Sequence, residues 1–242
     1  MEAHFTWVSL IFGHSLDQTV TATLVMLAIV AWAVVGLRQM QAVTDPVVPE
    51  DRLTARTMLE IFVEWFVGFA ESVLGKHAKR FVPMYGTFFL FILLANLSGL
   101  IPGFSPPTSN FNIAFALGVS SFLLYNYFGF AEHGVGYLKH FLGPIPWMVF
   151  LMLPLELIDN FVRPASLALR LFGNMTGDHV VLGIFTDLTK VVIPVIFLGL
   201  GTFVSMVQAF VFTILSMVYL SLALAGHDHD HEHEHAHAAE HH

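Results

Sequence analysis

Residues 154–182 read PLELIDNFVRPASLALRLFGNMTGDHVVL, an apolar segment that carries a regular series of polar residues. At 100° per residue these side chains fall within about 40° on either side of Glu156, so they form one polar stripe along a buried, apolar helix. The stripe consists of Glu156, Asn160, Arg163, Arg170, Asn174 and Asp178, with Ser166 at its edge. Pro164 removes the backbone hydrogen bond to the Asn160 carbonyl, which predicts a bend or a bound water at that point.

The composition around this segment is that of a membrane protein. Of the 242 residues, 56% are hydrophobic and 12% are charged, and the mean hydropathy is +0.71. A net charge of −8 gives no basic surface for nucleic acid, so no nucleic-acid partner is expected. The chain has no Cys, which excludes disulfides, thiolate metal sites and Cys nucleophiles.

Apolar stretches of sufficient length predict an all-α membrane protein with five spanning helices. The expected spans are about 20–36, 81–101, 111–131, 147–175 and 191–225, with an amphipathic interfacial helix at about 55–74. The last two stretches are longer than one crossing needs and predict a long, tilted hairpin. Residues 1–226 are therefore expected to form a single membrane domain.

The basic residues predict the orientation of the chain. Six of the ten Lys and Arg residues lie between the first and second spans, which places that connection in the cytoplasm. With five crossings, the N-terminus is then outside and the C-terminus cytoplasmic. The first eighteen residues lack a basic leader and a long apolar run, so we expect a short exposed N-terminus and not a signal peptide.

Two arginines on the stripe invite different interpretations. Glu156 and Arg163 are seven residues apart on one face and could form a structural ion pair or serve a function. Arg170 has no acid three or four residues away, and an arginine in hydrocarbon stays charged. We therefore expect Arg170 to meet a carboxylate from another helix or another chain.

The last apolar stretch offers a surface that could face the stripe. Gly201, Ser205 and Gln208 recur on one face, and the Gln208 amide needs partners in hydrocarbon. We expect it to point at Arg170 and Asn174 or at a file of waters; the alternative is a glutamine that only packs. Asp178 and His179 are expected near the turn between the last two helices, where His179 could pass protons or could simply be solvated.

Four motifs together resemble subunit a of the F-type ATP synthases. They are SLALRLFGNM (166–175), QAFVFTILSMVYLSLA (208–223), NLSGLIP (96–102) and PTSNFN (107–112). The resemblance implies that Arg170 is the stator arginine that meets the ionisable carboxylate of each passing c subunit, with Asn174 and Gln208 beside it. It also implies that Glu156 and Ser166 border the cytoplasmic aqueous half-channel.

The same resemblance sets the expected partners and location. It implies the c-ring, the b subunits of the peripheral stalk and the lipid bilayer as partners, in a bacterial inner membrane. It implies no cofactor, and ATP chemistry on other subunits, so the chain itself is not expected to be an enzyme. The coupling ion, proton or Na⁺, depends mainly on the c subunit.

The chain departs from the family pattern at the external half-channel. Members often have a Glu nine residues after the arginine and a His seven residues before the glutamine, where this chain has His179 and Gly201. Asp178 is expected to restore the acid, with Gly201 leaving room for it. Gly99 and Asn110 stand where the family tends to have acids.

The C-terminal segment 227–242 (HDHDHEHEHAHAAEHH) has a composition of its own. We expect a solvated, disordered cytoplasmic tail. The histidines His227, His229, His231 and His233 could also bind a divalent metal. A divalent-metal transporter is the alternative function, but the spans lack the His or Asp pairs four residues apart that such a transporter needs. No metal site is therefore expected in the membrane domain.

Overall fold

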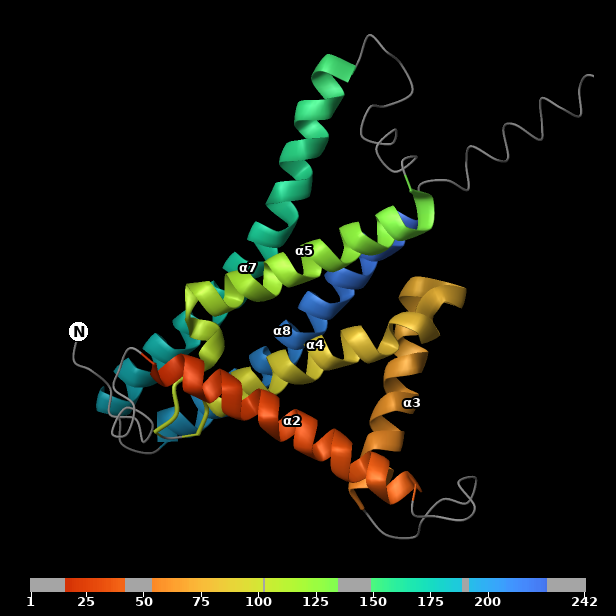
Figure 1. The fold of residues 1–242 in the computed structure, drawn as a ribbon. Helices are drawn as coiled ribbons and strands as arrows, with labels where there is room; N and C mark the ends of the chain where they lie inside the picture. The colour runs from red at the N-terminus through yellow and green to blue at the C-terminus, as the bar shows by residue number, and fades with distance from the viewer. Residues whose placement is uncertain (1–15, 42–53, 102, 135–148, 189–191, 226–242) are drawn as a thin grey trace, which may run out of the picture.

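The computed structural model describes residues 16–41, 54–101, 103–134, 149–188 and 192–225, and in this part of the chain every regular element is helical. The all-α prediction is confirmed. The helices are α2 (Asp17–Gln41), α3 (Ala55–Leu74), α4 (Ala78–Ser98), α5 (Phe111–His133), α7 (Val149–Leu188) and α8 (Val192–Ala225), with short 3₁₀ turns η1 (Gly75–His77) and η2 (Pro107–Ser109). Figure 1 shows α4, α5 and α8 side by side, with α2 and α3 on one flank and the start of α7 projecting beyond the bundle.

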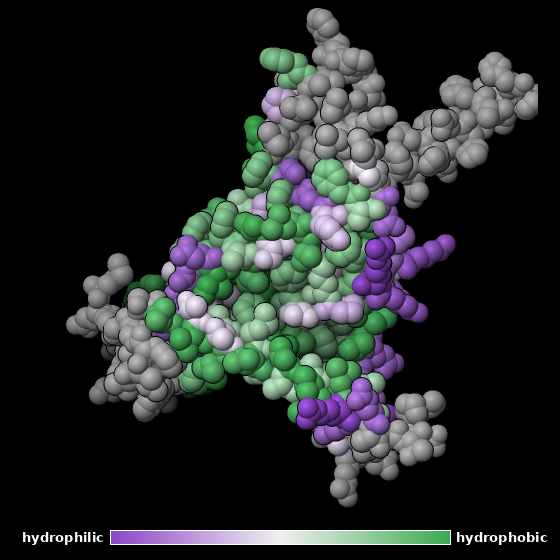
Figure 2. All heavy atoms as spheres, in the orientation of Figure 1, coloured by the Kyte–Doolittle hydropathy of each residue, from purple (hydrophilic) through white to green (hydrophobic). Residues whose placement is uncertain are grey.

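Length and composition identify four candidate membrane spans among the described residues. These are Asp17–Gln41, Ala55–Ser98, Phe111–Glu132 and Val195–Leu224. The polar α7 is not among them, although its 40 residues rise about 60 Å, twice the thickness of the hydrocarbon core. Large apolar side chains are exposed along the helices, and Figure 2 shows them covering the middle of one face, with hydrophilic residues towards its edges. The chain is thus a multi-pass membrane protein.

The helix α7 is longer than expected, whereas α8 has its expected bounds. We expected the fourth span to end near residue 175, but α7 continues to Leu188. Residues 180–185 (VVLGIF) continue the apolar surface, and Phe185 stacks on Phe197 of α8 with ring centroids 4.6 Å apart. Asp178 and His179 therefore lie within α7, and their expected place near a turn was wrong.

A small polar centre joins the three central helices. The Tyr85 hydroxyl of α4 donates to the Ser216 carbonyl of α8 at 3.1 Å, and the Ser121 hydroxyl of α5 lies 2.9 Å from the Ser216 hydroxyl. All three side chains are buried, and Phe88 and Phe212 pack beside them. Buried hydroxyls with partners stabilise helix contacts in lipid, where water cannot replace them.

The contact between α5 and α7 depends on a glycine. A Cβ atom at Gly118 would lie 2.6 Å from the Pro164 carbonyl oxygen, so only glycine lets the two backbones approach this closely. The contact fixes the position of the polar stripe, because Pro164 lies between Arg163 and Arg170 on α7.

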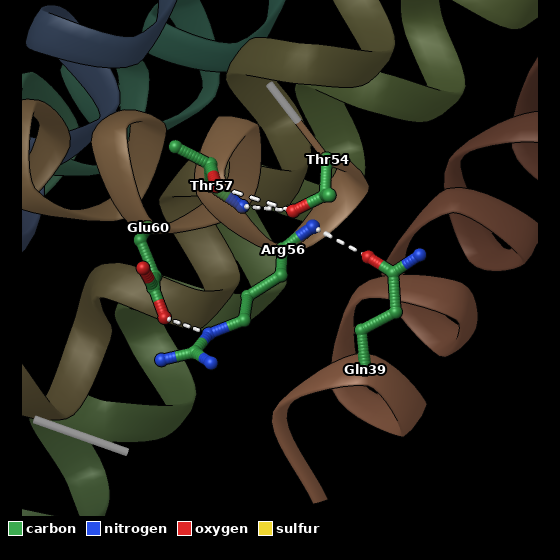
Figure 3. A network of polar contacts seen from close by, with 5 residues as sticks. All are labelled: Gln39, Thr54, Arg56, Thr57 and Glu60. Carbon is green, nitrogen blue, oxygen red and sulfur yellow. Dashed lines mark hydrogen bonds and ion pairs between the residues drawn. The ribbon is translucent and has the colours of Figure 1, made fainter. Parts of the chain in front are cut away.

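The ends of α2 are tied to the rest of the chain by side-chain hydrogen bonds. At one end, Gln18 bonds to Ser109 and Asn110 beside η2, at 3.1 and 2.8 Å. At the other end, Figure 3 shows the Arg56 backbone N–H donating to Gln39 at 3.0 Å and the Arg56 guanidinium paired with Glu60 at 2.7 Å.

The start and the packing of α3 are well defined. Figure 3 also shows Thr54, the N-cap of α3, accepting a hydrogen bond from the Thr57 N–H at 3.4 Å. The helix packs its aromatic face against α4 and α8, as in the stack of Phe69 on Phe210 at 4.4 Å. That α3 lies in the membrane interface stays a prediction.

Candidate functional site

Arg170 lies on a face of α7 that no other described helix covers. Its side chain is exposed, and among the described residues it has no ion pair, hydrogen bond or aromatic contact. Asn174, one turn further along α7, is exposed as well, whereas Ser166, one turn before Arg170, is half-buried. We had expected the stripe to lie on a buried helix; at Arg170 it lies on the outer surface of this chain.

Asn174 connects this surface to α8. Its side-chain Nδ2 donates to the Gln208 Oε1 at 2.7 Å, which is the Asn174 part of what we expected for Gln208. Gln208 is only 2% exposed, its Nε2 has no hydrogen-bond partner, and among the described residues it makes no hydrogen bond to Arg170. A buried amide with an unused donor suits a place that water or a partner chain reaches.

A cavity lies towards the α7–α8 turn, one helical turn beyond this pair. The space open to a water molecule measures ≈ 20 Å³, enough for one water. Its lining comes from the α4–η2 connection, α7 and α8, and includes Gly99, Leu100, Pro106, Met175, Asp178, His179, Gly201 and Ser205. The cavity thus brings together the four residues that the sequence assigned to an external half-channel and its support: Asp178, His179, Gly201 and Ser205.

Several buried polar atoms around the cavity lack partners. Asp178 Oδ2 and Ser205 Oγ line it and make no hydrogen bond, and Ser205 is fully buried. Thr176 Oγ1 and Asn96 Nδ2 are also without a hydrogen bond, although the Thr108 hydroxyl donates to the side-chain Oδ1 of Asn96 at 2.6 Å. Such atoms are costly in hydrocarbon, so their concentration at one end of the bundle is typical of a hydrated region.

Gly201 lies beside Leu100 in the wall of the cavity that Asp178 also lines. A Cβ atom at residue 201 would lie 2.9 Å from Leu100 Cδ2, so the Leu100 side chain packs against the glycine. That Gly201 leaves room for Asp178 stays a prediction. The segment that contains Gly99 and Leu100 forms the cavity wall with apolar atoms, where we had noted missing acids.

The stripe on the other side of Arg170 is held by contacts within the chain. Arg163 pairs with Asp159, with Nη2 to Oδ2 at 2.6 Å, and its guanidinium lies 5.2 Å from the ring centre of Tyr219 on α8. The Asn160 Oδ1 accepts a hydrogen bond from the Tyr125 hydroxyl at 2.5 Å. The same hydroxyl lies 3.5 Å from the Asn160 carbonyl that Pro164 leaves without its helical donor, the position where we expected a bend or a water.

These contacts change one of the sequence interpretations. Arg163 pairs with Asp159, an acid that the sequence interpretation did not consider. The Glu156 side chain lies outside the described residues, so its pairing with Arg163 stays a prediction. The spacing of Asp159 and Arg163, four residues apart on a helix, could have revealed this pair. Tyr125 and Tyr219 come from other helices and carried no signal in the sequence.

Metal ligands do not gather in the part of the chain that the structure describes. Among the described residues there is no group of three or more His, Asp or Glu side chains that could hold a metal ion. The tail histidines His227, His229, His231 and His233 lie outside the described residues.

Comparison with known proteins adds an independent result. The family model for the ATP synthase A chain matches residues 19–221. The chain is 41% identical over 220 residues to an ATP synthase subunit a of Bdellovibrio bacteriovorus, covering 90% of this chain and 96% of that protein. It is 41% identical to one from Geobacter sp. strain M21, with 84% and 86% covered, and 46% identical to one from Geotalea daltonii, with 67% and 72% covered. This chain therefore belongs to the ATP synthase A chain family.

Proposed function

We propose that this chain is the ion-translocating stator subunit of a rotary ATP synthase and that Arg170 is the residue that meets each rotor carboxylate. The observation that carries the proposal is an exposed guanidinium without a partner in the described chain. Insertion scales assign about 2.5–3.5 kcal/mol to an arginine in the middle of a membrane helix. A carboxylate on a neighbouring chain would remove that cost.

The surface around Arg170 suits close approach by a second helix. Gly173 and Gly177 follow it along α7 in a GxxxG pattern, and a Cβ atom at either position would meet nothing within 4 Å. Small residues at this spacing let helix backbones approach closely in lipid. We infer that a helix of the c-ring passes over this strip and brings its carboxylate to Arg170.

Two separate aqueous paths would lead to Arg170, one from each side of the membrane. The cavity at Asp178, His179 and Ser205 supports an external half-channel that leads through the Gln208–Asn174 pair. Glu156 and Ser166, on the opposite side of Arg170 along α7, are assigned to the cytoplasmic half-channel. Asn160 and Arg163 act as supporting residues, since their partners are tyrosines and an acid of the same chain.

Arg170 would couple ion flow to rotation through its permanent charge. When a rotor carboxylate releases its ion into one half-channel, its negative charge is stabilised beside the guanidinium and not against lipid. The same positive charge repels a proton or Na⁺ that would pass directly between the two paths. Net transport then requires the ring to turn, and each charge that crosses a potential of 100 mV contributes about 2.3 kcal/mol.

The remaining assignments follow from membership in the family. The chain is a non-catalytic subunit of the bacterial inner membrane, with its N-terminus outside and its C-terminus in the cytoplasm. ATP is made on partner subunits, the b subunits of the peripheral stalk hold this chain in place, and it uses no cofactor of its own.

The test is ATP-driven proton pumping by the assembled complex in vesicles. Arg170→Ala should abolish pumping and allow passive leakage, because nothing then separates the two paths. Arg170→Lys should fail as well, since a lysine placed in hydrocarbon can lose its proton. Normal pumping by either variant would contradict the proposal.

A further inference from the structure

We infer that residues 226–242 dock on a basic corner formed by Lys76, Lys79 and Arg80 at the α3–α4 turn. This interaction is separate from ion translocation. It rests on the charges exposed at the corner, on the position at which α8 ends, and on the composition of the tail.

The corner has exposed cationic side chains that form few or no ion pairs within the described part of the chain. Lys76 and Lys79 are exposed, and neither makes an ion pair or hydrogen bond among the described residues. Arg80 is only partly engaged: it bonds to Glu132 at the end of α5, at 3.1 Å, and its side chain stays 56% exposed. The corner therefore keeps an excess of positive charge next to the ends of α4 and α5.

The last turn of α8 lies at the same level as this corner. Tyr85 of α4 bonds to Ser216 of α8, and the two helices run in opposite directions from that point. Ala78 is seven residues before Tyr85, and Ala223 is seven residues after Ser216, so each helix rises about 10 Å to the same end of the bundle. Figure 1 shows α8 ending beside the end of α5, the helix whose Glu132 bonds to Arg80.

The segment that follows α8 is complementary in charge. Residues 226–242 contain five Asp or Glu and eight His, and no Lys or Arg. An extended segment of this length reaches about 55 Å, far more than the distance across the corner requires. Because the tail is tethered there, its local concentration is on the order of millimolar, which favours even a weak ionic contact.

The charge of the tail opposes that of the corner. With neutral His the tail carries five negative charges, whereas Lys76, Lys79 and Arg80 are positive. The other titratable groups near the corner are His77, Glu71 and Glu132.

Distance measurements between two spin labels can test the docking in the assembled ATP synthase. The chain has no native Cys, so Ser72→Cys beside the corner and Ala236→Cys in the tail give unique attachment points without changing a charge. The matched control pairs Ala236→Cys with Thr23→Cys, an exposed position near the start of α2. We expect a short, narrow distance population for the first pair at about pH 8 and low salt, lost in about 1 M salt, and none for the control.

Charge exchange separates a direct contact from other causes. The double variant Lys76→Glu and Lys79→Glu should abolish the short population without changing ATP-driven pumping. Adding Asp228→Lys, Asp230→Lys and Glu232→Lys should restore it. The inference is overturned if the short population is absent at pH 8 or survives the double variant. It is also overturned if anionic lipid in the vesicle removes the population, because the membrane surface and not the tail would then occupy the corner.

Discussion

Arg163 and Arg170 lie two helical turns apart on the same stripe of α7, yet their environments are opposite. Arg163 has an acid four residues before it and an aromatic ring of α8 beside it, so the chain itself satisfies its charge. Arg170 has neither of these contacts and faces outward. One polar stripe therefore has two parts. Contacts within the chain hold the turns around Arg163, and the turns around Arg170 are left exposed, where we propose that a partner chain binds.

Removing each charge in turn is the strongest way to test this contrast. We expect Arg170→Gln to leave the complex assembled and to reduce coupled pumping by more than a hundredfold, because electrostatic stabilisation of this kind contributes about 10²–10³ in rate. Arg163→Gln should lower pumping by a few-fold at most. ATP-driven acidification of vesicles measures both, and passive proton uptake should rise only in Arg170→Gln.

The control for this comparison is stability. Arg163→Gln leaves Asp159 without its partner, and Asp159 is 60% exposed, so the loss should be about 0–1 kcal/mol. Arg170→Gln removes no contact within the described chain and should not lower the thermal stability of the purified subunit. If both variants pump equally well, the contrast between the two arginines has no functional meaning.

The link between the two helices gives the next largest effect. Gln208→Leu keeps the size of the side chain but removes the acceptor for Asn174 and the unused amide donor. We expect about a tenfold loss of pumping, measured in the same vesicles. The matched variant is Thr213→Val on the same helix, because the buried Thr213 hydroxyl bonds only to the Ala209 carbonyl of its own helix at 2.8 Å. Equal losses in the two variants would mean that Gln208 only packs.

The cavity should contribute less, because water can carry a proton past a single missing group. Asp178→Asn is expected to slow pumping a few-fold, since it removes the one carboxylate in the cavity lining. Ser205→Ala should have a smaller effect of the same kind. The loss should be greatest when proton supply from the external side limits the rate, which proton-driven ATP synthesis measured across external pH detects. An unchanged profile in Asp178→Asn would remove the cavity from the path.

The sequence predicted the helical fold and the polar face of α7 because both depend on local periodicity. The apolar runs predicted each of the long helices, and the largest difference in bounds is the end of α7, where VVLGIF continued the helix. The pair of Asn174 with Gln208 followed from the need of a buried amide for a partner. Contacts such as Tyr125 with Asn160, or Leu100 against Gly201, join residues that are distant in sequence, and no local pattern encodes them.

The smallest expected effect concerns the segment beyond α8. Deleting residues 227–242 should leave pumping unchanged, because the proposed path lies on α7, α8 and their neighbours. Alternating His with Asp and Glu offers neutral imidazole and carboxylate ligands that bind Zn²⁺ or Ni²⁺, so the same deletion should abolish binding of these metals, as calorimetry can measure. Replacing His227, His229, His231 and His233 with Gln is the matched variant, since it keeps the length and the acids; it should weaken metal binding at least tenfold. Loss of pumping on deletion would instead mean that the tail takes part in ion translocation. The contrast between Arg163 and Arg170 would then no longer be sufficient to explain which parts of the chain are needed for pumping.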